Sequence, residues 1–409
     1  MDAASTIFTA ELVLLTPVCN YLNLGFLPIG VKVQKVIKCK VVCLTNVKRE
    51  LLTQEYENLQ RFLHGDNSVR LYSANKQQAK RFYKRVKDKE YPLSIRKDLI
   101  KVEKRDTKIA KYWARIPVSG RRGGVWVAIK PHQDIPDDVE ICESKLFRRG
   151  SDFYLHLTIQ KEIDFVKVET SDYVLCAPPS FTVNEKTVVI AIDVGEANPM
   201  TSVELWGFGM QRKNVRFLGR EVRAIRQHYN WVKKSVGRKK IRHALKWIKE
   251  HVEHKESRKV ADVLHKATRS IVDRAIELKR SGFEPIIVFG DLKGVRKPRV
   301  KGEVRCRKNN RKVHTMPSFK IKHMLTYKAL WAEIPVATVN EAWTSKQCWR
   351  CGSTNTVVRK RMFKCKDCGL EYNRDLNGSV NIGNRLLGYM LRSRADVNQP
   401  QTPPVCSVD

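Results

Sequence analysis

The chain has 409 residues, with 78 Lys and Arg against 42 Asp and Glu, so its formal net charge is +36. Hydrophobic residues make up 42% of it, enough to fill the cores of two or three domains, which excludes a disordered basic tail. No run reaches the roughly 18 to 20 apolar residues of a membrane span, and residues 12–28 lack the basic flank of a signal peptide. We therefore expect no membrane association, and a polyanion, most commonly nucleic acid, as partner.

The N-terminal half alternates between strand and helix patterns. Residues 30–46 alternate apolar and basic positions, which predicts a strand with one cationic face. Residues 48–112 follow helical spacing, and strand-like alternation then returns. This order predicts a β-barrel domain made of residues 1–47 and 113–170, with 48–112 as a helical recognition insertion. The next segment, residues 171–186, contains two adjacent prolines and predicts a linker.

Three apolar runs in the C-terminal half each end near an acidic residue. They span residues 187–195, 285–291 and 334–341, and continuous apolar runs are typical of buried central strands. Open α/β sheets place ligands at the carboxyl ends of their strands, where these acids lie. The intervening residues 211–260 are strongly basic and helical in spacing, with 17 Lys and Arg against 4 Glu.

These patterns predict an α/β domain interrupted by two insertions. We expect the domain to comprise residues 187–343 and 373–395, with a helical insertion at 219–284, and residues 396–409 to form a disordered tail. Residues 293–328 carry 13 Lys and Arg and one acid, a density that would repel itself unless a polyanion neutralises it.

Four cysteines predict a zinc ribbon at residues 344–372. Cys348 and Cys351 are followed by Cys365 and Cys368 in the spacing C-x2-C-x13-C-x2-C, and a glycine follows each pair. Four thiolates in two close pairs form a closed tetrahedral site, which suits structural Zn²⁺ and leaves no open position for catalysis.

Carboxylates on either side of the ribbon predict a second metal site. Asp193 ends the first apolar run, and Asp375 follows the ribbon where a helix pattern begins. Several carboxylates from distant segments are needed to hold two Mg²⁺ ions of a nuclease centre. Each residue alone also fits a turn or a helix cap. In the same helix pattern, we expect Asn377 and Asn381 to line one wall of the site.

The sequence resembles a known family. The segments IAIDVGEANPMTS and IIVFGDLKGVRK, and the block from NEAWTSKQCWRCGS to EYNRDLNGSVNIGNRLL, resemble the split nuclease motifs and zinc ribbon of transposon-encoded TnpB proteins. These are compact relatives of type V CRISPR effectors and of the eukaryotic Fanzor proteins. The resemblance covers roughly residues 187–390. It implies an RNase H-like (RuvC) nuclease domain after the β-barrel domain, a guide RNA, and target double-stranded DNA cleaved with Mg²⁺.

The chain departs from the family at one acidic position. TnpB proteins usually carry Glu-Asp-Leu at the end of the second nuclease strand, whereas this chain has Gly290-Asp291-Leu292. Glu341, at the end of the adjacent strand, is the leading replacement, and family members with a relocated glutamate are known. Asp291 is the second candidate, although it is expected to point away from the side of residue 290. A surface role for Glu341 also stays open.

The resemblance and its departure leave three functions open. The leading one is an RNA-guided DNA endonuclease with Asp193, Glu341 and Asp375 as catalytic, magnesium-binding residues. The second is a nuclease-dead, RNA-guided repressor, and the third is a zinc-ribbon nucleic-acid-binding protein without a guide. We expect a cytoplasmic, nucleoid-associated protein, or a nuclear one if the source is a eukaryote. The number of protomers is left open.

Overall fold

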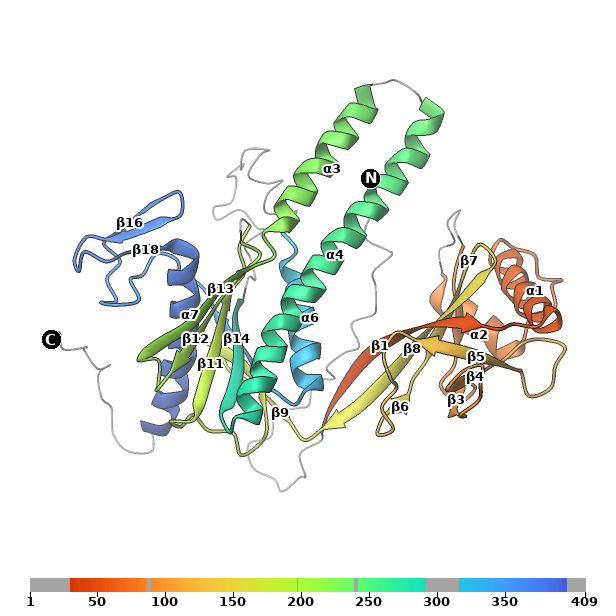
Figure 1. The fold of residues 1–409 in the computed structure, drawn as a ribbon, viewed down its shortest axis with the longest axis horizontal. Coiled ribbons are helices and arrows are strands. Elements are labelled where there is room, and N and C mark those ends of the chain that lie inside the picture. Colours follow the sequence, from red (N-terminus) through yellow and green to blue (C-terminus); the bar gives the residue numbers. More distant parts are fainter. Residues whose placement is uncertain are drawn as a thin grey trace. The chain divides into compact units, whose positions relative to one another are not determined.

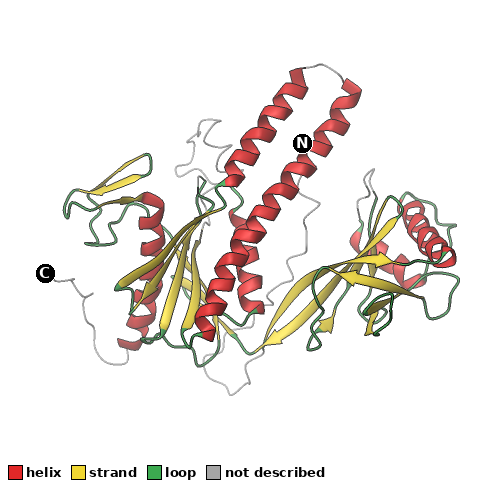
Figure 2. Ribbon diagram, viewed as in Figure 1, coloured by secondary structure: helices red, strands yellow, loops and turns green. Residues whose placement is uncertain are grey.

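A computed structural model describes residues 30–84, 86, 90–196, 198–238, 242–291 and 316–395 (Figures 1 and 2). The described residues divide into two compact units, one made of Lys32–Glu162 and one that begins at Ile163. The central part of the basic loop, residues 292–315, and the predicted tail, 396–409, lie outside the described residues. Among the described helices, none is both long and apolar enough to cross a membrane.

The first unit contains an eight-stranded sheet and two helices. Its strand order is β2-β7-β8-β1-β5-β4-β3, with β6 paired to β8. Within the described residues no further pair joins β2 to β3, so closure into a barrel stays a prediction. The strands and helices are β1 Val31–Val42, α1 Asn46–Leu63, α2 Ser73–Phe82, β2 Leu93–Ile95, β3 Lys101–Lys104, β4 Tyr112–Ile116, β5 Val125–Pro131, β6 Glu140–Ile141, β7 Ser144–Arg149 and β8 Asp152–Ile163.

The predicted helical insertion at 48–112 is shorter than its spacing indicated. Helices α1 and α2 lie within it, but residues 93–95 and 101–104 are strands. Pro92 has no backbone N–H to continue a helix, and the buried residues of β2 pair with β7 instead. The prediction was therefore wrong for the second half of the segment.

The second unit is organised around a seven-stranded mixed sheet in the order β13-β12-β11-β14-β15-β10-β9. Strand β11 pairs antiparallel with β12 and parallel with β14, which pairs parallel with β15. The three predicted apolar runs are thus three adjacent strands, β11, β14 and β15. The bounds are β9 Val166–Glu169, β10 Tyr173–Ala177, β11 Thr187–Asp193, β12 Met200–Trp206, β13 Gln211–Leu218, β14 Glu284–Asp291 and β15 Val336–Asn340.

The predicted linker at 171–186 was wrong in its first part. Residues 173–177 form β10, which pairs antiparallel with β15. The preceding strand, β9, was assigned from the sequence to the barrel domain but pairs with β10 in this sheet. The two prolines come directly after β10 and therefore end the strand without removing a hydrogen bond from it.

Helices cover both faces of this sheet (Figure 1). Helix α7, Arg374–Ala395, packs across β11, β12, β14 and β15. Helices α3 (Glu221–Arg238) and α4 (Arg242–Arg280) lie in the predicted insertion, and α4 contacts β14 and α6 (Ser318–Trp331). The core under α7 is built from alternate residues of the strands, including Val189, Ala191, Val203, Leu205, Ile286, Val288, Ala337 and Val339, together with Val380, Ile382 and Leu386 of the helix.

Helix α7 approaches the sheet most closely at two glycines. A Cβ atom at Gly383 would lie 2.3 Å from Cδ1 of Leu205 and 3.0 Å from Cβ of Ala191. A Cβ atom at Gly378 would lie 2.9 Å from Oδ2 of Asp193. These contacts seat the helix directly on β11 and β12, so that its first turn lies beside the carboxyl end of β11.

This close approach predicts an overpacking effect. We expect Gly383→Val to lower the free energy of unfolding by about 1–3 kcal/mol, because the strands must move to admit the side chain. Gly388, on the same helix, has no heavy atom within 4 Å of a built Cβ. Gly388→Ala is therefore the matched control, and we expect it to gain up to about 1 kcal/mol from helix propensity. Urea unfolding measures both, and equal effects would contradict the packing argument.

Candidate zinc ribbon and carboxylate centre

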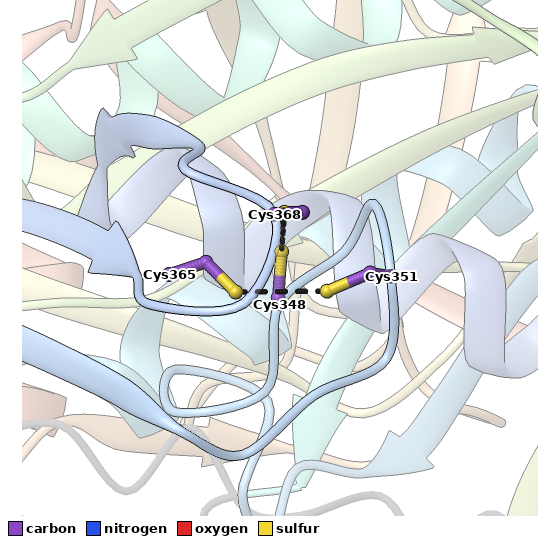
Figure 3. A group of neighbouring side chains, drawn as sticks. All are labelled: Cys348, Cys351, Cys365 and Cys368. Atoms are coloured by element: carbon purple, nitrogen blue, oxygen red, sulfur yellow. Dashed lines mark hydrogen bonds between the residues drawn. The ribbon is translucent and has the colours of Figure 1, made fainter. Parts of the chain in front are cut away.

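The four predicted zinc ligands come together in a small three-stranded subdomain (Figure 3). Its strands are β16 Thr356–Arg359, β17 Met362–Cys365 and β18 Glu371–Asn373. Gly352 and Gly369, each directly after a cysteine pair, have φ of 72°, which confirms the left-handed turns expected there. Phe363 is fully buried between the cysteine pairs and supports the subdomain from within.

The spacing of the sulfur atoms fits a zinc ion. All four Sγ atoms lie within 4.8 Å of one another; the Cys348–Cys368 distance is 3.7 Å and the Cys351–Cys365 distance is 3.6 Å. Tetrahedral coordination with Zn–S bonds of about 2.3 Å requires sulfur atoms about 3.8 Å apart. The cysteines are therefore able to hold one tetrahedral zinc ion.

The structure brings the three predicted carboxylates to one end of the sheet. Asp193 is the last residue of β11, Glu341 directly follows β15, and Asp375 lies in the first turn of α7. Asp193 and Ala191 are two residues apart on β11 and share the face that α7 covers. The charges of both other carboxylates act on Asp193.

Glu341 occupies the space that a side chain at residue 290 would need. A Cβ atom built on Gly290 would lie 2.2 Å from Oε2 and 2.8 Å from Cβ of Glu341. In β14 and β15, Gly290 is paired with Val339, two residues before Glu341. The glycine thus leaves room for the glutamate. Where TnpB proteins usually have a glutamate side chain at position 290, this chain has the side chain of Glu341 in the same space.

Asp375 is held by polar residues that the sequence analysis did not single out. Asn198, which is 1% exposed, donates a hydrogen bond from Nδ2 to Oδ2 of Asp375 at 2.6 Å. Arg220 Nε donates in turn to Oδ1 of Asn198 at 3.0 Å. Asn198 lies five residues after Asp193, inside the first nuclease-like segment, which was the available signal. The amide fixes the orientation of the carboxylate and leaves its other oxygen free of this bond.

Burial, with like charge added, raises the pKa of two of these carboxylates, Asp193 and Glu341. Burial, followed by the negative charges of Glu341 and Asp375, raises the pKa of Asp193 to about 7. Burial also raises the pKa of Glu341 to about 7, with Lys322 opposing the shift and Asp291 adding to it. A divalent cation among these groups would relieve the repulsion, so the charge pattern fits Mg²⁺, which prefers oxygen ligands.

Asp291 lies on the other side of β14, as expected from strand alternation. Its Oδ1 is 3.4 Å from Nζ of Lys322, which belongs to α6 on the face opposite α7. Asp291 therefore contributes charge near Glu341, while Glu341 lies on the same face as Asp193.

Asn377 and Asn381 have a different role from the predicted one. Both are buried, and both donate from Nδ2 to the carbonyl oxygens of Thr344 and Gln347, at 2.7 to 3.2 Å. Asn377 Oδ1 also accepts from the backbone N–H of Trp349, at 3.3 Å. Their Nδ2 groups bind the turn between Glu341 and the first cysteine pair, so these groups point to the turn and not to the carboxylates. They connect the ribbon to α7.

Comparison with known proteins gives a family match for the segment that contains the ribbon. Residues 319–382, from α6 to the first turns of α7, match the family described as Cas12f1-like, TNB domain. This match identifies the ribbon and its flanking helices as a type of domain found in Cas12f1-like proteins.

Similarity outside this segment extends to TnpB-like proteins. A TnpB-like protein of Methanocaldococcus jannaschii is 26% identical over 200 residues, which cover 49% of this chain and 66% of that protein, slightly less than two thirds. The CRISPR-associated endodeoxyribonuclease Cas12f1 of Sulfoacidibacillus thermotolerans is 35% identical over 66 residues, 16% of each chain. The resemblance to the TnpB proteins is confirmed.

A solved Cas12f1–sgRNA–target DNA complex also aligns with the chain. The alignment covers 86% of this chain and 99% of the solved one, at 14% identity and a TM-score of 0.35. At this score the likeness does not by itself define the fold.

Removal of zinc tests the role of the ribbon. We expect Cys365→Ser to lose bound zinc and to release the ribbon from its fold, since structural zinc contributes directly to folding free energy. Metal analysis of the purified protein and protease sensitivity of residues 344–372 measure the two effects. Cys176→Ser, at a buried cysteine in β10, is the control and should retain the zinc. Full zinc content in Cys365→Ser would contradict the assignment.

The raised pKa of Asp193 predicts a stability gain on its neutralisation. The folded-state pKa of about 7 lies above the value of about 4 for an unfolded chain, so the wild type loses stability as pH rises from 4 to 7. At pH 8 without divalent cations, we expect the free energy of unfolding of Asp193→Asn to exceed that of the wild type by roughly 4 kcal/mol, because the shift is about three pKa units. The gain should shrink as the pH falls toward 4.

Urea unfolding in EDTA at several pH values measures this difference. Asp273→Asn, at an exposed ion pair on α4, is the matched control and should change stability by less than about 1 kcal/mol at any pH. A pH-independent effect of Asp193→Asn would show that burial and repulsion do not raise its pKa.

Proposed function

We propose that the chain is an RNA-guided DNA endonuclease of a transposon, hydrolysing phosphodiester bonds in an RNase H-like (RuvC) site. The observation that carries the proposal is the meeting of Asp193, Glu341 and Asp375. These residues come from β11, from the end of β15 and from α7, and the electrostatic effect on Asp193 includes both others. A structural role alone would not favour several like charges at one partly buried position.

The sheet supports an RNase H-like domain. Three antiparallel strands, β13, β12 and β11, are followed by β14 and β15, which run parallel to β11. The acidic residues lie at the carboxyl ends of β11 and β15, as ligand sites of open sheets do. Helix α7 then adds its first turn, where the helix dipole favours a carboxylate.

Asp193, Glu341 and Asp375 are the residues that would hold Mg²⁺. Bound Mg²⁺ supplies charge neutralisation at the phosphate and lowers the pKa of water, the chemistry of two-metal nucleases. Asn198 holds the orientation of Asp375, and Gly290 leaves room for Glu341.

The guide RNA and target DNA follow from charge and resemblance. A net charge of +36 is suited to an RNA, a heteroduplex and a displaced strand, and base pairing then reads the sequence. The Cas12f1 relative is named as an endodeoxyribonuclease, in agreement with DNA as the substrate.

Gly290 favours a second candidate, a nuclease-dead RNA-guided repressor, because the usual glutamate of the second strand is missing. The carboxylate of Glu341 within 2.2 Å of a built Cβ at residue 290 argues for the active form.

Cleavage of a plasmid distinguishes the two candidates. With the RNA that co-purifies and Mg²⁺, we expect the wild type to cut a plasmid that matches the guide. We expect Glu341→Ala to lower the rate by on the order of a hundredfold, since a ligand to a catalytic metal contributes several kcal/mol. Glu333→Ala is the matched control, since Glu333 precedes β15 at the end of the strand opposite Glu341, and it should keep the wild-type rate. An uncut plasmid that the complex still binds would favour the repressor.

Exchange of the two positions sharpens this test. In Gly290→Glu combined with Glu341→Ala, a carboxylate is restored from β14 into the space that Glu341 vacates. We expect the double variant to recover part of the activity lost in Glu341→Ala. The single variant Gly290→Glu should be impaired, because its side chain collides with Glu341. If the double variant recovers no activity, a carboxylate from β14 cannot replace that of Glu341, and the interpretation of Glu341 as a relocated glutamate is contradicted.

A further inference from the structure

Trp343 is a large aromatic residue that the fold leaves in solvent. Its exposed fraction is 67%, and it lies in the turn between Glu341 and the zinc ribbon. Burying a tryptophan is strongly favourable, so an exposed one next to an acidic centre suggests contact with a ligand. No other part of the proposed mechanism uses this side chain.

The backbone of Trp343 is held in a conformation that bulky residues rarely adopt. Its φ is +69°, in the left-handed region that favours glycine. Two backbone N–H groups, of Lys346 and Gln347, donate to its carbonyl oxygen at 2.8 and 3.0 Å. The Asn377 and Asn381 amides fix the same turn from the side of α7. Strain of this kind persists at ligand sites, where the surrounding structure determines it.

A cation accompanies the exposed ring. Nζ of Lys346 lies 5.2 Å from the centroid of the Trp343 ring. An exposed ring with an ammonium group over one face is suited to one nucleotide, with the base stacked on the other face and the phosphate near the cation. An apolar protein partner would gain nothing from the cation.

The backbone of Trp343 lies close to that of Glu341 along the chain. Trp343 is two residues from Glu341, and two residues span at most about 7 Å. A nucleotide whose base stacks on Trp343 can therefore place its phosphate at or next to the position that the carboxylate centre addresses. The turn fixes this distance because the carbonyl oxygen of Glu341 accepts from both N and Oγ1 of Thr344, at 3.2 and 2.9 Å.

We propose that Trp343 is a positioning residue that stacks on a base of single-stranded DNA next to the scissile phosphate, with Lys346 beside that base's phosphate. The proposal rests on the proposed nuclease function and adds the residue that holds its substrate strand. Because stacking is possible with every base, the contact orders the strand without reading its sequence. A guide-directed enzyme needs such sequence-independent positioning.

Binding without cleavage tests the contact independently of activity. The full-length protein with its co-purified RNA is titrated in EDTA with short single-stranded DNA that contains 2-aminopurine, and quenching by stacking is followed. We expect Trp343→Leu to weaken binding about 5- to 150-fold, the range for loss of one base–aromatic stack. Trp343→Phe should retain most of the affinity and the quenching. Equal quenching in wild type and Trp343→Leu would overturn the proposal.

Substrates with one abasic nucleotide distinguish stacking from a structural role. In wild type and Trp343→Phe, we expect slower cleavage when the abasic position lies next to the scissile phosphate. Trp343→Leu should cleave the intact strand slowly and the abasic strand at the same slow rate. The variant already lacks the ring, so removal of the base abolishes no further contact. Trp231, which is also 67% exposed but lies on α3, is the matched control. Trp231→Leu should keep the wild-type dependence on abasic position.

The outcomes separate the two proposals. If no variant cleaves, including wild type, the nuclease function fails, and the quenching experiment still decides the contact. If all proteins cleave and the abasic position has the same effect in wild type and Trp343→Leu, the nuclease function stands and the contact is rejected. Unchanged zinc content in Trp343→Leu verifies that the ribbon remains folded.

Discussion

The seating of α7 on β11 without an intervening side chain is the constraint on which the rest of the second unit depends. At Gly378 and Gly383 the helix meets Asp193 and Leu205 directly. Asp375 is separated from Asp193 by more than 180 positions in the sequence, and this contact brings its helical turn to the same end of the sheet. Ser379 adds a hydrogen bond from Oγ to the carbonyl oxygen of Thr201, at 2.8 Å. A larger residue at either glycine would separate the acidic residues as well as the packing layers.

The same helix joins the zinc ribbon to the carboxylates. Asn377 and Asn381 hold the turn that begins at Glu341 and ends at Cys348, so the ribbon and the glutamate are fixed to one surface. A zinc ion held by the four cysteines would stabilise the end of this turn, and the turn sets the position of Glu341. A structural metal would thus support, through backbone contacts, a site to which it contributes no ligand.

The sequence predicted the parts of this structure that depend on local pattern. The apolar runs located β11, β14 and β15, and cysteine spacing located the ribbon. The failures have physical causes. Residues 93–104 have helical spacing but form strands, because Pro92 cannot continue a helix and distant strands pair with them. Strand β10 was not predicted, because the two prolines that follow it indicated a linker. Asn198 was not identified because its hydrogen bond to Asp375 forms across the fold.

The relation between Gly290 and Glu341 shows how two adjacent strands share one space at the end of the sheet. Adjacent parallel strands bring their carboxyl ends to the same edge, so a carboxylate from either strand reaches the same space. The exchange requires the vacated position to be small, since a Cβ at residue 290 would stand 2.2 Å from the glutamate oxygen. The glycine and the glutamate are therefore one structural feature, in which the small residue at 290 leaves the space that the side chain at 341 fills.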